Sequence, residues 1–213
     1  MIKDVVILTK STMYGGFCIT GFELKSRKWI RFVSDALGTP LMGPQTKFLN
    51  VPGFLEPLDI VRVNTTREVP INNHTEDVIV NYETLRKRGS SRLEAVLRFH
   101  PAESHEYIFG NNSDSLTEQE MNTFNFNYSL VFVNAKNFEI TYQKKRERIS
   151  CRASFSYNNH KYSSIRITDP VYTSRNENLK LNEAYLIVSM PKVPFEKDGR
   201  FYKFAAKIFP LPE

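Results

Sequence analysis

Along most of the chain, short apolar runs alternate with polar and turn-forming segments. Between residues 17 and 22, apolar and polar side chains alternate with a period of two, which is typical of a strand with two different faces. A polar segment at 25–28 leads into a second run at 29–33, and the two runs predict a β-hairpin. Further strands are expected at 4–9, 59–63, 77–80, 130–133, 138–142, 149–157, 161–168, 185–189 and 201–209. The chain is therefore predicted to be mainly β.

The middle of the chain has a different pattern, with apolar residues at helical spacing. Ser91 and Glu94 have the spacing of a capping box, in which each side chain satisfies a free backbone N–H group at the start of a helix. This spacing predicts a short helix over 91–99. Ser115 and Glu118 repeat it ahead of further apolar residues. Residues 82–127 are therefore expected to form a partly helical connector.

Turn-forming residues and the distribution of strands indicate how the chain is divided. Residues 36–58 hold seven glycines and prolines, which predicts a long loop. The pair Asn158 and Asn159 predicts a tight hairpin turn, because asparagine tolerates positive φ. The fold class predicted from these patterns is all-β with a small helical connector. Its parts are an N-terminal β-barrel over 1–81, the connector over 82–127 and a C-terminal β-barrel over 128–213.

Composition and charge point to a partner rather than to a fold. The 213 residues are 41% hydrophobic and 24% charged, which is ordinary globular usage. A net charge of +6 favours a polyanionic partner, with nucleic acid ahead of an anionic membrane surface. Cys18 and Cys151 have no neighbour at metal-ligand spacing and are expected to be reduced thiols. The short apolar start does not fit a signal peptide, and no run approaches the ~18 apolar residues of a membrane helix, so a cytoplasmic protein is expected.

Motifs for catalysis are sparse. His100 and His105 are separated by five positions with a proline between them, which does not match the helical spacing of zinc ligands. Asp59, Glu76 and Asp77 begin predicted strands and would hold Mg²⁺ for phosphodiester cleavage if they converged. No nucleophile elbow, phosphate-binding loop or dinucleotide fingerprint is present in the sequence. The sequence therefore predicts a non-enzymatic protein without a cofactor, with a metal-dependent nuclease as an alternative.

Basic residues gather in three segments: around the first hairpin, in the connector and at 144–152. Phosphate recognition needs positive side chains on one surface, and base stacking needs aromatic side chains beside them. Trp29 and Arg31 share one face of their predicted strand, and the alternation leaves open whether that face is exposed. The residues predicted to contact nucleic acid are Lys28, Trp29, Arg31, Arg62, Lys144, Lys145, Arg146, Arg148, Arg152, Tyr162 and Lys203.

Several short motifs together resemble a known family. Their residues are Lys10, Gly16, Cys18, Gly21, Trp29, Ile30 and Arg31, then Leu58-Asp59-Ile60-Val61 with leucine in place of the usual glycine, Glu76-Asp77-Val78 and Tyr202-Lys203. This combination resembles bacterial proteins with a dual OB-containing domain. The resemblance implies two OB-like barrels joined by a helical segment, and a role in bacterial defence through binding of nucleic acid or a nucleotide. It brings no catalytic residues.

The main hypothesis from the sequence is a cytoplasmic OB-fold protein that binds single-stranded DNA or RNA, because OB barrels bind oligonucleotides across one sheet face and its loops. One alternative is a sensor of a small nucleotide, in which Asp77 and Asp169 orient a base or ribose and Lys203 binds a phosphate. Another is an interaction module that binds a partner protein from the same locus.

Overall fold

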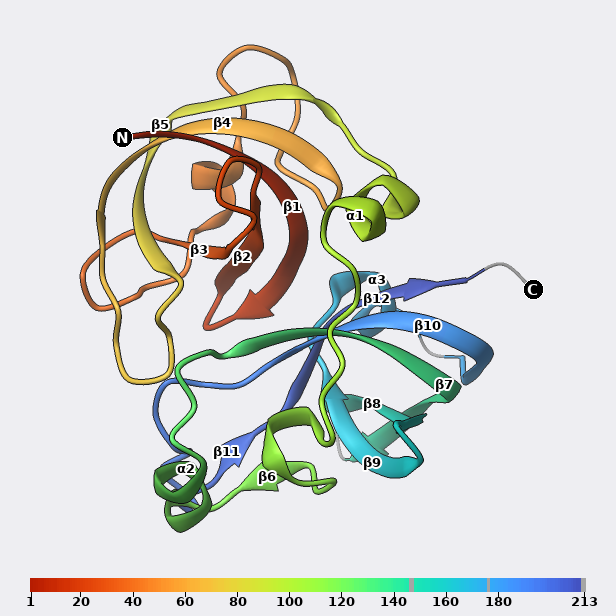
Figure 1. The fold of residues 1–213 in the computed structure, drawn as a ribbon. Helices are drawn as coiled ribbons and strands as arrows, with labels where there is room; N and C mark the ends of the chain where they lie inside the picture. The colour runs from red at the N-terminus through yellow and green to blue at the C-terminus, as the bar shows by residue number, and fades with distance from the viewer. Residues whose placement is uncertain (146–147, 176, 212–213) are drawn as a thin grey trace. The chain divides into compact units, whose positions relative to one another are not determined.

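The computed structural model describes residues 1–145, 148–175 and 177–211, with side chains described outside 143–149. The chain divides into two compact units, Met1–Pro101 and Ala102–Glu213, and each contains a closed five-stranded barrel (Figure 1). This confirms the predicted fold class of two OB-like barrels. The boundary predicted after residue 81 falls inside β5 (Asp77–Ser90), so the first barrel takes in the start of the predicted connector. None of the helices among the described residues is long and apolar enough to cross a membrane.

The first barrel closes by pairing its first and fourth strands. Its strands follow the order β1-β2-β3-β5-β4, in which β3 and β5 are parallel and β1 and β4 are antiparallel. The long loop predicted over 36–58 is present and contains the single 3₁₀ turn η1 (Gly43–Thr46). The remaining elements of this unit are β1 (Ile2–Met13), β2 (Gly16–Glu23), β3 (Trp29–Val33), β4 (Asp59–Glu68) and α1 (Leu93–Phe99).

Strand alternation explains the interior of the first barrel. Ile19 on β2 and Ile30 and Phe32 on β3 all belong to its buried core, one residue out of step with Trp29 and Arg31. Gly21 is required where β2 pairs with β1 beside a register shift, because a Cβ atom there would lie 2.0 Å from the carbonyl oxygen of Val6. Gly21, one of the residues that carry the family resemblance, therefore has a packing explanation.

The second barrel repeats this topology with different residues. Its strands follow the order β7-β8-β9-β12-β10, with β9 and β12 parallel and β10 pairing back to β7. Its strands and its short helix are β7 (Leu130–Lys145), β8 (Arg148–Tyr157), β9 (His160–Ile167), α3 (Pro170–Thr173), β10 (Leu179–Ser189) and β12 (Phe204–Pro210). Outside the barrel lie η2 (Ile108–Gly110), α2 (Glu118–Phe124) and a two-stranded sheet of β6 (Ser115–Leu116) and β11 (Phe201–Tyr202).

The predicted turns and helix caps have different outcomes. Asn158 and Asn159 have φ values of 46° and 64°, which confirms the tight turn between β8 and β9. The capping box at Ser91 is wrong: α1 begins at Leu93 without a side-chain cap, and the Ser91 backbone N–H donates to the carbonyl of Leu58 instead. In α2 the box is formed by Thr117 and Glu120, two residues later than predicted.

Candidate nucleic-acid interface

Arg31 lies on the outer face of β3, yet its side chain is buried. Its guanidinium forms ion pairs with Glu76 at 3.0 Å and Asp77 at 3.1 Å, and it contacts Nδ1 of His74. These three partners lie at the end of the β4–β5 loop and the start of β5. Arg31 therefore holds that loop onto the barrel. The phosphate contact predicted at Arg31 does not fit this arrangement, because carboxylates from the same unit already compensate its charge.

His74 is enclosed by charged groups on three elements. Burial lowers the pKa of His74, and the neighbouring Arg31 guanidinium lowers it further, against the opposing effect of Asp77 and Glu76. Burial also raises the pKa of the Cys18 thiol on β2, which lies within the electrostatic reach of Arg31. His74 is therefore neutral in the folded protein at neutral pH.

The first unit is expected to lose stability as the pH falls below about 6.5, the ordinary value for histidine. The lowered pKa means that the unfolded chain binds a proton at His74 before the folded protein does, so the free energy of unfolding falls with falling pH. Urea unfolding followed by Trp29 fluorescence measures it, since Trp29 is the sole tryptophan and lies in this unit. In His74→Gln the decline should be weaker, whereas His160→Gln in the second unit should leave it unchanged. An identical decline in His74→Gln would contradict this assignment.

Trp29 is half-buried on the same outer face as Arg31. Its ring centroid lies 4.2 Å from that of Phe22, which in turn stacks on His100 at 3.7 Å. The indole is therefore engaged in an aromatic cluster at the end of α1, and the neighbouring Lys28 remains exposed in the hairpin turn. The outer face of β2 and β3 in this barrel is largely covered by residues of its own unit.

Arg62 is half-exposed on β4 and has a carboxylate partner. Its Nε and Nη2 atoms donate to the two carboxylate oxygens of Asp4 at 2.8 and 2.6 Å. Hydrogen bonding to Arg62 lowers the pKa of Asp4. Across the β4–β5 pairing, Arg62 lies opposite Arg86. Its charge is thus shared with Asp4 before any ligand binds.

Tyr162 and Lys203, which were predicted to contact nucleic acid, lie in the interior of the second unit. Tyr162 is 0% exposed, and its hydroxyl accepts a hydrogen bond from the backbone N–H of Ile108. Lys203 is 1% exposed, and its Nζ atom donates to the backbone carbonyl and to Oδ1 of Asn111, both at 2.7 Å. The ammonium group also lies 5.4 Å from the centre of the Tyr162 ring. Tyr162 faces inward on β9, and Lys203 lies between β11 and β12 with its side chain buried, so neither side chain is accessible to a ligand at the surface.

The carboxylates considered for metal binding do not converge. Asp59 forms an ion pair with Lys87 at 2.5 Å, whereas Glu76 and Asp77 pair with Arg31. Across the described residues, no group of three or more histidines, cysteines or acidic residues is arranged to hold a metal ion. The residues of the nucleotide-sensor alternative are likewise engaged, because Asp169 caps α3 and pairs with Lys207 at 3.0 Å.

The basic segment at 144–152 leads into the second barrel. Arg146 lies outside the described residues, and Lys144, Lys145 and Arg148 are described only by their backbone positions at the ends of β7 and β8. Arg152 is described fully. Its Nε atom donates to the hydroxyl of Ser150 and its Nη1 atom donates to the carbonyl of Ser164, both at 3.0 Å. These two bonds hold the guanidinium against the outer face of β8 and β9.

Arg166 lies directly opposite Arg152 in the antiparallel pairing of β9 with β8. Arg166 is exposed, as is Lys161, which lies opposite Ser156 on the same pair of strands. The outward side chains define what is here called the basic face: Arg152, Ser154, Ser156, Lys161, Ser163, Ser164 and Arg166. The inward side chains of β8 and β9 are buried in the barrel core. Neither strand contains aspartate or glutamate. The acidic residue paired with this face is Glu139 on β7, opposite Ser154, and Glu139 forms an ion pair with Lys180 at 3.6 Å.

A backbone irregularity shapes this face. Ser164 has φ +62°, the left-handed region that non-glycine residues adopt at a cost of about 1–3 kcal/mol. The register of β8 and β9 shifts at this point, which identifies a β-bulge. The Ser164 N–H donates to the hydroxyl of Ser154 at 3.3 Å, and the Ser164 carbonyl accepts from Arg152. The bulge therefore aims a carbonyl at the guanidinium and fixes its direction.

Sequence reasoning found Arg152 but missed Arg166. The segment 160–167 contains inward Tyr162, Ile165 and Ile167, so a strict alternation is interrupted at the bulge. Pairing β9 with β8 through the Asn158–Asn159 turn alone would place Ile165 opposite Arg152. The bulge at Ser164 shifts the register by one residue and brings Arg166 to that position. Neither a local motif nor the turn itself therefore identifies Arg166.

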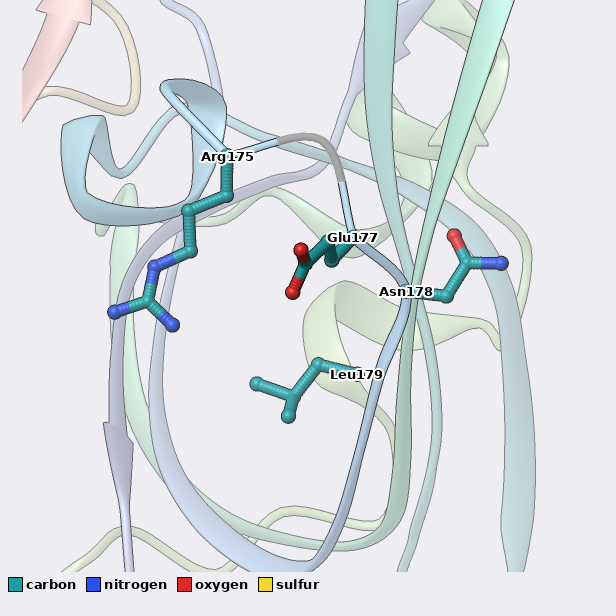
Figure 2. A pocket seen from close by; sticks show the side chains of 4 residues that line it. All are labelled: Arg175, Glu177, Asn178 and Leu179. Atoms are coloured by element: carbon teal, nitrogen blue, oxygen red, sulfur yellow. The ribbon is translucent and has the colours of Figure 1, made fainter.

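A separate hollow of about 460 Å³ lies between α3 and β10 (Figure 2). Arg175, Glu177, Asn178 and Leu179 line it. Glu177 projects into the same space as Arg175, and the Arg175 guanidinium lies 5.5 Å from the ring of Tyr172. The hollow therefore presents both charges and lacks the uniform positive character of the basic face.

Comparison with known proteins agrees with the topology of the barrels. The family model described as the dual OB-containing domain matches residues 3–208, which takes in both barrels. No curated protein and no solved structure matches the chain. A pair of OB-like barrels is a binding module, since this fold presents a sheet face and its loops to ligands. The chain belongs to the dual OB-containing domain family.

Proposed function

We propose that this protein binds nucleic acid through the basic face of its second barrel. The observation that supports the proposal most directly is the cross-strand pair of Arg152 and Arg166. Favourable cross-strand pairs contribute roughly 0.2–1 kcal/mol to the stability of a sheet, whereas like charges directly opposite each other are destabilising. A phosphate bound between the two guanidinium groups relieves this repulsion and gains charge-assisted hydrogen bonds.

The surroundings of Arg152 favour phosphate binding over a purely structural role. The Ser150 hydroxyl accepts from Nε of Arg152 and the Ser164 carbonyl accepts from Nη1. The planar guanidinium has five N–H donors in all, so further donors remain for a ligand. An arginine already held in one direction loses less side-chain entropy when it binds a ligand. The exposed serine hydroxyls beside it are further donors of the kind that contact phosphates.

The test compares Arg152→Gln, Arg166→Gln and the double variant with wild-type protein in binding to an oligonucleotide across a salt series. Each single change is expected to weaken binding about tenfold, because a hydrogen bond to a charged group contributes roughly 1.5–3 kcal/mol. The double variant should reduce the magnitude of the slope of log K against log[salt] by about 1.4–1.8, for two phosphate contacts.

Arg86→Gln is the matched control, because it removes one positive charge from an exposed strand position of the first barrel. It should change binding far less than Arg166→Gln does. Unchanged affinity and salt slope in a folded double variant would overturn the proposal.

The proposal includes a role in bacterial defence, which the family resemblance implies. Phage plating on cells that express wild-type protein or the double variant tests this role.

A further inference from the structure

We infer that Phe195, Tyr202 and Phe204 form a base-stacking subsite at the edge of the basic face, which selects single-stranded nucleic acid. This inference rests on the proposed function, because the basic face would hold the phosphates of the same strand. The three residues are called the aromatic group below. Phe195 lies in the loop after β10, Tyr202 on β11 and Phe204 at the start of β12.

The aromatic group adjoins the basic face through strand pairing. Phe204 on β12 is the parallel partner of Arg166 on β9, and Arg166 is in turn the partner of Arg152 on β8. Paired positions of neighbouring strands project to the same side of a sheet. The three side chains therefore form one row across three strands, with a length of about 10 Å for two strand spacings.

Burial indicates that Phe204 faces outward. Ala205 and Ile208 of β12 belong to the core of the second barrel, whereas Phe204 is only half-buried. Its ring packs against Phe195 at 6.0 Å between centroids, and Phe195 packs edge-on against Tyr202 at 5.3 Å. All three rings keep part of their surface accessible. Such a group outside the core has aromatic area to offer to a ligand.

The polar contacts of the group fix the position of one ring. The Tyr202 hydroxyl donates to Oδ2 of Asp198 at 2.7 Å, and this bond lowers the pKa of Asp198. The Asp198 carboxylate also accepts from the backbone N–H of Arg200 at 3.2 Å, and the charges of Arg200 and Lys197 act on it in the same direction. The carboxylate that holds the Tyr202 ring is therefore accompanied by cations.

The geometry points to unpaired bases as the ligand. A base stacks on an aromatic side chain only when its π-face is free, and in a duplex both faces of an internal base are covered by its neighbours. A row of two arginines and a phenylalanine can hold adjacent phosphates and accept one splayed base. Every base has such a face, so the subsite is expected to show little preference for sequence.

The experiment measures binding of three probes of equal length: a single-stranded oligothymidylate, the corresponding abasic oligonucleotide and a duplex. Wild-type protein is expected to bind oligothymidylate about 5-fold to 150-fold more tightly than the abasic strand, the range for stacking of one base. In Phe204→Leu this preference should be lost while binding to the abasic strand is kept. Tyr202→Phe keeps the ring and should keep the preference.

The outcomes separate this inference from the proposed function. Arg166→Gln should weaken binding of oligothymidylate and of the abasic strand by the same factor. Equal binding of both strands by wild-type protein, an unchanged preference in folded Phe204→Leu, or tighter binding of the duplex would overturn the stacking subsite alone. Failure of wild-type protein to bind any of the three probes would overturn the proposed function together with the subsite.

Discussion

Replacing Arg31 with methionine is expected to lower the free energy of unfolding of the first unit by about 3–5 kcal/mol, which is the usual cost of breaking a buried ion pair by removing one partner. The side chains of Arg31, Glu76 and Asp77 are exposed by only 5%, 5% and 1%. Removing the guanidinium leaves two carboxylates in a site with little access to water. The unfolding of this unit can be followed by Trp29 fluorescence in a urea series.

A matched control comes from the same unit. Arg62→Met removes an arginine whose side chain is 42% exposed, and its pair with Asp4 is expected to contribute about 0–1 kcal/mol. Converting Glu76 and Asp77 to their amides in the Arg31→Met background should recover part of the lost stability, because the uncompensated charges are then gone. A loss below about 1 kcal/mol in Arg31→Met would show that water reaches this cluster and would contradict the burial argument.

The strand pattern could be predicted from sequence because it depends on neighbouring residues. Alternation separated Ile30 and Phe32 from Trp29 and Arg31 correctly, and the structure places the former pair in the core. Which residues cover the outer face depends on the loop that carries His74, more than forty positions later in the chain. Local periodicity contains no information about such a distant contact.

The predictions for the site residues also depend on whether the information is local or comes from distant parts of the chain. A cluster of basic residues predicts Arg152. Its partner Arg166 is found only from the register of β8 and β9, which the bulge at Ser164 shifts by one residue. The residue types of Tyr162 and Lys203 predict contact with nucleic acid, because aromatic and basic side chains suit it. Tyr162 faces the barrel core, whereas Lys203 lies between β11 and β12 and reaches Asn111 at the end of η2, more than ninety positions earlier in the chain. Residue type alone does not determine on which side of a strand a side chain lies.

The two barrels share a topology but differ at the equivalent pair of strands. In the first, the outer face of β2 and β3 is covered, with Arg31 compensated by the carboxylates of its own unit. In the second, the outer face of β8 and β9 carries Arg152 and Arg166 opposite each other. In the first barrel, Glu76 and Asp77 follow the fourth strand, β4, and pair with Arg31. The difference therefore comes from the residues after this strand and not from the topology of the barrel. One fold therefore supports a self-compensated face and a charged face in a single chain.

The second unit is expected to become more stable by about 2 kcal/mol between about pH 7 and pH 9, because of Lys203. Burial lowers the pKa of Lys203 to about 7, from an ordinary value of 10.5, against the opposing charges of Glu120 and Asp114. Between these two values the unfolded chain binds one proton more than the folded protein does. The free energy of unfolding therefore rises with pH throughout this window.

Lys203→Met should abolish this rise, since methionine fills much of the same volume without a titratable group. Pulse hydrogen exchange of peptides from β9 and β12 across a urea series isolates the second unit from the first. Lys161→Met is the control, because Lys161 is exposed on the neighbouring strand and should leave the rise intact. Tyr162 does not interfere, as burial raises its pKa to about 12. A flat pH dependence in wild-type protein would mean that Lys203 stays protonated in the folded state, with Asn111 and the nearby carboxylates compensating its charge in full.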